Sequence, residues 1–295
     1  MTALQKSTVL TQAWQAWIQE NLARQCSTDS LVEAMVRDNF DAKFARASVE
    51  AVLQGLSAQS GTSMTSDALN ECAVNYVDES PRIQRVGNGI STSDRLVRIT
   101  LWMECPCIVV LDDFMSSEEC DRLVEMSKAK LSRSTTVNPA TGQLDVIDAR
   151  SSTGTYFAVC ENEFVATLDR RIAEVMHWPM ENGEGIQILR YENGGEYKPH
   201  FDYFEPTHSG SQTHLAKGGQ RVSTLVMYLS DVPEGGETHF PDLHLGVTPR
   251  KGRAVYFEYC NSLGQVDPRS LHAGLPVTQG VKWIATKWMR QHRYG

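Results

Sequence analysis

The segment from Tyr197 to Phe204, YKPHFDYF, places His200 and Asp202 two residues apart among aromatic side chains. In a strand, residues i and i+2 point to the same face, so both side chains can approach one point. An imidazole and a carboxylate placed in this way could chelate a metal. With eight histidines, about one such spacing is expected by chance, and no other histidine is followed two residues later by an acid. The pair therefore predicts a metal site only if a further ligand joins it.

A third ligand and a cation occur near the C-terminal end, in SLHAGLPVTQGVKWIATKWMR. His272 lies in a strand-like stretch, and Lys282 follows ten residues later, beyond a turn signal at Gln279-Gly280. Two histidines and a carboxylate on one face of an octahedron describe a non-heme Fe(II) site with three open positions. Zinc could use the same three ligands with water as the fourth.

Lys282 favours iron over zinc. A 2-oxoglutarate that chelates iron through its keto-acid end leaves its distal carboxylate in need of a positive partner. Most lysines are exposed, but Lys282 shares strand parity with Ile284, Thr286 and Trp288, which look buried. Lys282 is therefore predicted to face the interior and to bind the cosubstrate. The rival histidines lie in loop-like or turn-like stretches and are predicted to be structural or exposed: His208, His214, His239 and His244.

The elements that must position these residues follow from the periodicity of the chain. Apolar residues with a 3.6-residue period predict helices over 10–22, 27–40 and 41–53, within a small helical module at 1–56. Residues 57–95 are rich in Ser, Thr, Asn and Gly and are predicted to be a linker.

Residues 96–295 are predicted to form the second domain. The stretch 96–114 is strand-like, a capping box at 116–119 opens a helix to about Leu131, and another helix is predicted over 162–177. Beyond Trp178, short period-2 segments alternate with Gly, Pro and Asn. This order predicts an α+β fold with a double-stranded β-helix (jelly-roll) core and buttressing helices.

Composition excludes several classes of function. Hydrophobic residues at 41% and charged residues at 22% are typical of a globular protein. The net charge of -8 argues against nucleic acid, which requires a basic face. Seven cysteines show no disulfide or zinc-knuckle spacing. No signal peptide or membrane span is recognisable, so no membrane partner and a cytoplasmic location are predicted.

From about Pro106 to Arg290 the chain resembles the prolyl 4-hydroxylases of the 2-oxoglutarate and Fe(II)-dependent dioxygenase superfamily. Five blocks carry the resemblance, in the order of the family: DARSSTGTYF, ENGEGIQILRYENGGEYKPHFDYF, GGQRVSTLVMYLSDVPEGGETHFP, the strand-like stretch at 252–259, and SLHAGLPVTQGVKWIATKWMR. Five ordered blocks are far more specific than any single motif.

The resemblance assigns roles to individual residues. It implies that His200, Asp202 and His272 bind Fe(II), and that Lys282 and Tyr191 bind the distal carboxylate of 2-oxoglutarate. It further implies a peptide groove lined by Tyr197, Arg221 and Trp288, and a mobile loop that closes over substrate and contains Arg150, Ser151 and Ser152. Glu184 and Glu237 also match family blocks and are left without a role.

The activity implied by the resemblance is hydroxylation of peptidyl proline at C4, with decarboxylation of 2-oxoglutarate to succinate and with O2 and ascorbate as further requirements. The alternatives are the same chemistry on a free amino acid or another residue type, a non-catalytic jelly-roll binding module, and a zinc hydrolase.

The helical module at 1–56 lies outside the resemblance. It is either a small bundle that packs on the catalytic domain or a docking module that recruits a protein partner through exposed Trp14, Trp17 or Phe40.

Overall fold

The computed structural model describes residues 6, 10, 12–23, 26–59, 76–137, 142–145 and 149–295. The chain forms two compact units, Met1–Tyr76 and Val77–Gly295. Much of the predicted linker, 60–75, lies outside the described residues. The structure places its remainder from Val77 onward in the second unit, where it contributes strand β1, Gly89–Ser91.

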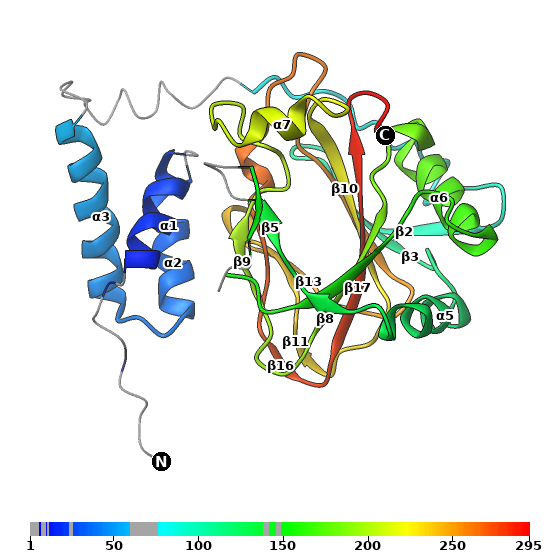
Figure 1. Cartoon of the computed structure of the whole chain (residues 1–295), viewed down its shortest axis with the longest axis horizontal. Helices are drawn as coiled ribbons and strands as arrows, with labels where there is room; N and C mark the ends of the chain where they lie inside the picture. Colours follow the sequence, from blue (N-terminus) through cyan, green and yellow to red (C-terminus); the bar gives the residue numbers. More distant parts are fainter. Residues whose placement is uncertain are drawn as a thin grey trace. The chain divides into compact units, whose positions relative to one another are not determined.

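The N-terminal unit contains three helices, α1 (Gln12–Ala23), α2 (Thr28–Arg37) and α3 (Ala42–Gln59), drawn in blue in Figure 1. The side chain of Ser27 accepts a hydrogen bond from the backbone N–H of Ser30 and so caps α2. Phe40 is only 4% exposed and meets the ring of Trp14 edge-on at 5.2 Å. Phe40 is therefore a core residue, and its prediction as an exposed docking residue is wrong; Trp14 and Trp17 are half-buried.

The second unit is built on antiparallel strands. The larger sheet has the order β1-β2-β3-β14-β10-β17-β8-β7-β4, and a four-stranded sheet has the order β13-β12-β15-β9. Two small pairs, β11-β16 and β5-β6, complete the described strands. This is the predicted jelly-roll arrangement. The bounds after β1 are as follows: β2 Leu96–Met103, β3 Ile108–Asp112, β4 Ser132–Arg133, β5 Thr136–Val137, β6 Leu144–Asp145, β7 Thr153–Phe157, β8 Ile186–Tyr191, β9 Tyr197–His200, β10 Arg221–Tyr228, β11 Glu234–Gly235, β12 Thr238–Phe240, β13 Leu245–Val247, β14 Ala254–Glu258, β15 His272–Gly274, β16 Val277–Gln279 and β17 Lys282–Arg290.

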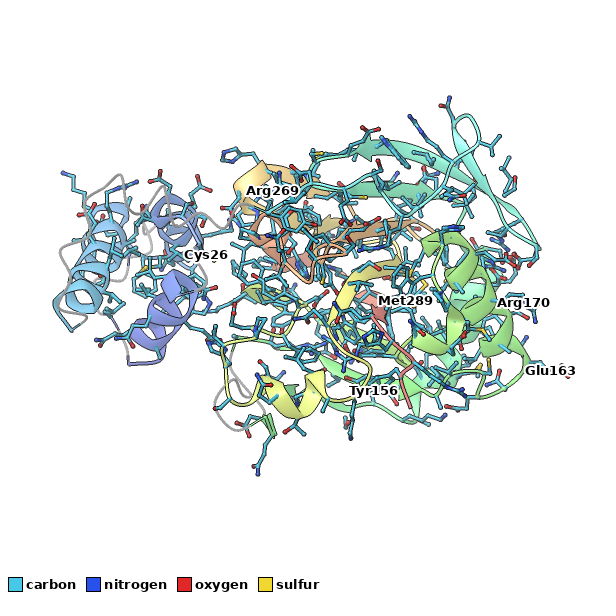
Figure 2. The ribbon with its side chains drawn as sticks, turned by 90° about the horizontal axis from the view of Figure 1, so that it is seen from above. Cys26, Tyr156, Glu163, Arg170, Arg269 and Met289 are labelled. Atoms are coloured by element: carbon cyan, nitrogen blue, oxygen red, sulfur yellow. The ribbon has the colours of Figure 1, made fainter. Side chains whose placement is uncertain are left out.

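Two helices buttress this unit, α5 (Ser117–Lys128) and α6 (Glu163–Met176), and they lie together on one side of it in Figure 1. Ser116 and Glu119 form the predicted capping box of α5. Figure 2 shows Glu163 and Arg170 on the outward side of α6. The inward side is held to β17 by an ion pair between Lys287 and Asp169, 2.7 Å apart and both fully buried. The short helix α7, Ser211–Leu215, lies in a stretch that was predicted to be a loop.

A cluster of charges joins α6 to the segment before β2. The guanidinium of Arg171 is buried and donates to both carboxylate oxygens of Asp94, to the carboxylate of Glu119 and to the backbone oxygen of Phe114. A buried cation paired in this way compensates its desolvation through several charge-assisted hydrogen bonds. The cluster therefore fixes both helices on the sheet.

The segment at 77–82 runs along the loop between β14 and β15. Arg82 pairs with Glu258 at 2.8 Å, and the side-chain amide of Asn261 donates to the backbone oxygen of Val77 at 3.1 Å. Further along, the carboxylate of Asp78 lies 2.5 Å from the guanidinium of Arg269. These contacts tie the residues that precede β1 to the loop that leads into β15.

The cysteines and the lengths of the helices are known over the described part of the chain. Its six cysteines, at 26, 105, 107, 120, 160 and 260, are free thiols. Within the same residues no helix combines the length and the apolar character that crossing a bilayer requires.

Candidate metal centre and cosubstrate pocket

The pairing of β9 with β15 brings two distant histidines together. His200 and His272 are direct partners across these antiparallel strands. Strand β9 ends at His200, so Asp202 lies in the bend that follows rather than in the strand itself. The distance from His200 Nε2 to Asp202 Oδ1 is 3.7 Å, and that from His272 Nε2 to Asp202 Oδ2 is 3.6 Å. Bonds of about 2.1 Å to one metal ion allow two ligand atoms to be up to about 4.2 Å apart, so these distances fit a shared ion.

The imidazoles are oriented for metal binding by the backbone. His200 Nδ1 lies 2.8 Å from the carbonyl oxygen of Lys198, and His272 Nδ1 lies 2.9 Å from that of Ser270. Because a carbonyl only accepts, each Nδ1 donates a proton to the backbone, which leaves Nε2 as the ring nitrogen that can bind a metal. Such backbone acceptors are the usual way to fix the ring of a ligand histidine.

The electrostatics of the site favour the protonation states that ligands need. Burial, together with the neighbouring His272, lowers the pKa of His200 well below its usual value, which keeps the ring neutral. Burial by itself would raise the pKa of Asp202, but His272, His200 and Arg221 outweigh it and hold this pKa at about 2. Two neutral imidazoles and one carboxylate are the donor set of a non-heme Fe(II) site.

Aromatic rings surround the two histidines. The ring of Tyr197 stacks on His200 with centroids 3.5 Å apart, and the rings of Phe257 and Phe240 lie 4.7 and 5.9 Å from that of His272. These rings exclude water from one side of the candidate metal position.

Lys282 faces the interior, as its strand parity predicted, and is only 3% exposed. Its ammonium group makes no hydrogen bond or ion pair within the described ranges, and it lies 5.6 Å from the ring of Tyr191 and 5.9 Å from that of Tyr228. Burial lowers the pKa of Lys282 to about 8, against the opposing charge of Glu237. A buried, unpaired cation is costly, so this position suits an anionic ligand.

Tyr191 is placed beside Lys282 by strand register, because the two residues are direct partners across β8 and β17. Both are buried. Sequence reasoning missed two further polar residues on this side, Tyr228 and Thr238, whose hydroxyls are 2.7 Å apart. Tyr228 shares the parity of Thr224 within the apolar run RVSTLVMY, which is the signal that could have identified it.

The predicted groove residue Arg221 is held by Glu184, which had no role in the sequence analysis. Two nitrogens of Arg221 donate to the two carboxylate oxygens of Glu184 at 2.7 and 2.9 Å. The guanidinium lies 3.9 Å from the ring centroid of Trp288 and also donates to the backbone oxygen of Asp202. The indole N–H of Trp288 is buried and has no acceptor among the described residues. The structure therefore brings Arg221, Trp288 and Tyr197 around the metal ligands.

The resemblance placed Arg150, Ser151 and Ser152 in a mobile loop that closes over substrate. In the structure, each of the three is hydrogen-bonded to a neighbouring segment. Arg150 is buried, donates to Gln187 at 3.1 Å and lies 4.8 Å from the ring centroid of Tyr197. The backbone N–H of Ser151 donates to the oxygen of Glu196, and the hydroxyl of Ser152 donates to that of Ser134. Residues 146–148, which precede them, lie outside the described residues.

The rival histidines do not join the cluster. Among the described residues, His200, Asp202 and His272 form the single group of three or more metal-ligating side chains. His214 instead stacks on Phe204 at 5.1 Å, and its Nε2 donates to the backbone oxygen of Gly142 at 2.9 Å.

Comparison with known proteins identifies the chain. Residues 186–290, which include the three candidate ligands and Lys282, match the model of the 2OG-Fe(II) oxygenase superfamily. Prolyl 4-hydroxylase 1 of Arabidopsis thaliana is 42% identical over 229 residues, which cover 72% of this chain and 76% of that protein. Probable prolyl 4-hydroxylase 10 of the same plant is 37% identical over 231 residues, 72% of this chain and 78% of its own. The chain belongs to the prolyl 4-hydroxylase family.

Two solved structures are also similar to this chain. A viral collagen prolyl hydroxylase from Paramecium Bursaria Chlorella virus-1, in complex with 2-oxoglutarate, is 29% identical with a TM-score of 0.49 and is covered to 95%, against 62% of this chain. A Pseudomonas putida prolyl-4-hydroxylase is 19% identical with a TM-score of 0.40, over 64% of this chain and 93% of its own.

Membership of the prolyl 4-hydroxylase family confirms the predicted family, enzyme class and cofactors. The protein is a 2-oxoglutarate- and Fe(II)-dependent dioxygenase, an enzyme class that uses O2 and ascorbate. The roles of individual residues remain predictions.

Proposed function

We propose that this chain hydroxylates C4 of proline in a peptide substrate. One oxygen atom of O2 enters the proline, the other enters succinate, and 2-oxoglutarate loses carbon dioxide. The observation that carries the proposal is the position of the buried, unpaired Lys282 in a jelly-roll core that also holds the cluster of His200, Asp202 and His272. The names of the plant relatives support proline as the target.

The three clustered residues would hold Fe(II) through two imidazoles and one carboxylate. Iron together with 2-oxoglutarate and O2 supplies the oxidising power for breaking a C–H bond. Lys282 would pair with the distal carboxylate of 2-oxoglutarate, next to the ring of Tyr191. Such a pair in a buried pocket is stronger than one in water and would fix the orientation of the cosubstrate.

The substrate would lie against Tyr197, Arg221 and Trp288. Aromatic rings suit a proline-rich segment in its extended polyproline II form. The guanidinium of Arg221, fixed by Glu184, offers hydrogen bonds to the carbonyl oxygens of a peptide. The rings of Tyr197, Phe257 and Phe240 would keep water away from the reacting C–H bond.

The test is incubation of the full chain with Fe(II), 2-oxoglutarate, ascorbate, O2 and a set of proline-rich peptides. We expect a gain of about 16 mass units on proline, with one succinate released per hydroxylation. Amino acid analysis of the product should give 4-hydroxyproline. An Asp202→Ala variant serves as the inactive control.

The alternatives give different results in the same assay. Oxidation of free amino acids without oxidation of any peptide would point to a small-molecule hydroxylase. Binding of Fe(II) and 2-oxoglutarate without turnover of either substrate class would contradict the proposed catalysis.

A further inference from the structure

Two fully buried hydroxyl groups stand behind the candidate ligand Asp202. Thr224 lies on β10, and its Oγ1 is 2.7 Å from Asp202 Oδ2. The same Oγ1 is 2.9 Å from the hydroxyl of Tyr259, which follows the end of β14. Thr224 lies in β10 and Tyr259 directly follows β14, which is the neighbour of β10 in the large sheet, whereas Asp202 follows β9 of the small sheet. The three groups therefore connect the two sheets at the candidate metal position.

The direction of the hydrogen bonds follows from counting protons. An ionised carboxylate can only accept, so Thr224 must donate its single hydroxyl proton to Asp202 Oδ2. Thr224 then has only lone pairs to offer Tyr259, so the tyrosine donates to the threonine. Burial raises the pKa of Tyr259 well above its usual value, and this keeps the phenol protonated. The chain of donors runs in one direction, from Tyr259 through Thr224 to Asp202.

This series of hydrogen bonds makes the two carboxylate oxygens of Asp202 unequal in their hydrogen bonding. Oδ2 accepts from Thr224. Oδ1 accepts no hydrogen bond from any described residue and lies 3.7 Å from the Nε2 of His200, whereas Oδ2, which is already engaged by Thr224, lies 3.6 Å from the Nε2 of His272. A carboxylate with one oxygen engaged in this way is fixed in its side-chain rotation and presents the other oxygen as the free ligand atom.

We propose that Thr224 and Tyr259 are positioning residues for iron, which reserve Asp202 Oδ1 for the metal by holding Oδ2. The inference rests on the proposed metal site and deepens it. Neither hydroxyl has another described partner that would explain its burial, since the hydroxyl of Tyr259 bonds only to that of Thr224, and the hydroxyl of Thr224 only to Tyr259 and Asp202.

The experiment compares the metal affinity of the full chain with that of variants, by anaerobic titration with Fe(II) and, separately, with Co(II), whose absorption spectrum reports the ligand geometry. Thr224→Val keeps the shape of the side chain and removes the donor. We expect it to weaken the affinity by about 10- to 100-fold, as is typical when a partner of a metal ligand is lost, and to change the Co(II) spectrum. Thr224→Ser restores the hydroxyl and should restore both.

Tyr259→Phe removes the first donor of the chain. It should weaken metal binding less than Thr224→Val, and it should add no further loss in the Thr224→Val background, because the chain is then already broken. Ser127→Ala is the control for the loss of a buried hydroxyl. It removes a fully buried hydroxyl on α5 that donates to the backbone oxygen of Leu123, outside the candidate site. We expect its metal affinity to equal that of the wild type.

The outcomes separate this inference from the proposed function. A wild-type chain that fails to bind Fe(II) would overturn the metal site as a whole. A wild-type chain that binds, with Thr224→Val and Tyr259→Phe binding equally well and giving the same Co(II) spectrum, would overturn the positioning role alone. If Thr224→Val does not fold, Thr224→Ser and Tyr259→Phe decide the question: unchanged affinity and spectrum in Tyr259→Phe would refute the chain of donors.

Discussion

Replacing Lys282 with methionine should stabilise the metal-free and cosubstrate-free protein while it destroys cosubstrate binding. Methionine keeps the length and much of the volume of the side chain and removes its charge. Burial lowers the pKa of Lys282 from 10.5 to about 8, which corresponds to about 3 kcal/mol of destabilisation at pH 7, where the ammonium is charged in both the folded and the unfolded chain. Lys282→Met should recover part or all of that free energy of unfolding.

Binding of 2-oxoglutarate should respond in the opposite direction. If Lys282 pairs with the distal carboxylate, its loss leaves a buried charge without a partner, which costs about 2 to 5 kcal/mol. The dissociation constant should therefore rise by about 30-fold to several thousand-fold. Anaerobic calorimetric titration of the Fe(II)-loaded protein measures it, and urea unfolding at pH 7 measures the stability.

The pH dependence supplies a second readout of Lys282. Between pH 8 and 10.5 the unfolded chain still binds the lysine proton whereas the folded chain has lost it. The free energy of unfolding of the wild type should therefore gain a contribution from Lys282 as the pH rises through this window, and Lys282→Met should lack that contribution.

Lys287→Met is the matched control, since it makes the same change five positions along β17. Lys287 is fully buried and paired with Asp169 at 2.7 Å. Its loss should destabilise the protein by about 3 to 5 kcal/mol, because it leaves a buried carboxylate unpaired. Equal losses of stability in the two variants, together with an unchanged affinity of Lys282→Met for 2-oxoglutarate, would refute the reasoning.

Three further perturbations test other parts of the molecule. Glu184→Gln should raise the KM for peptide without changing Fe(II) affinity, because it frees Arg221 from its bidentate partner; steady-state kinetics and metal titration would contradict this if both constants moved together. Arg171→Leu should lower the free energy of unfolding by about 2 to 4 kcal/mol, because it leaves Asp94 without its cation and Glu119 with Arg95 alone; urea unfolding checks this, and a loss under about 1 kcal/mol would show that solvent screens the cluster. Phe40→Ala should destabilise the N-terminal unit by about 3 to 5 kcal/mol while peptide hydroxylation persists; amide hydrogen exchange in α1, α2 and α3 measures the opening of this unit, and unchanged exchange rates would contradict the core role of Phe40.

Most helices of the fold could be predicted from the sequence, because the spacing of apolar residues within each helix is a local pattern. The helices α2 and α6 carry apolar residues every three to four positions and polar caps at their starts, so they could be predicted closely. Helix α3 was predicted over 41–53 and runs to Gln59, into the stretch predicted to be a linker. Helix α5 was predicted to reach about Leu131 and ends at Lys128, and such ends depend on contacts that a periodic pattern does not encode. The short α7 has too few residues to show a period.

The candidate site could be predicted where residue type alone carries the chemistry. His200, His272 and Lys282 are polar residues in strands, Asp202 follows one of these strands, and strand parity was enough to predict that Lys282 faces the interior. The residues that hydrogen-bond to these side chains are harder to predict. They are common amino acid types, and only their proximity to the site in the folded chain gives them a role. Thr224 and Tyr259 lie 35 positions apart and meet through the pairing of β10 with β14, which no spacing rule predicts.

The contacts of residues 77–82 change where this enzyme can be shortened. A fragment that starts at residue 96, as composition would suggest, discards the partners of Glu258, Asn261 and Arg269. Those three residues precede His272 along the chain, so the loop that leads into β15 and His272 would lose stabilising contacts. A fragment that starts before Val77 retains them. Residues 77–82 therefore belong to the catalytic unit, and we expect their removal to weaken metal binding at the candidate site, although none of them is a candidate ligand.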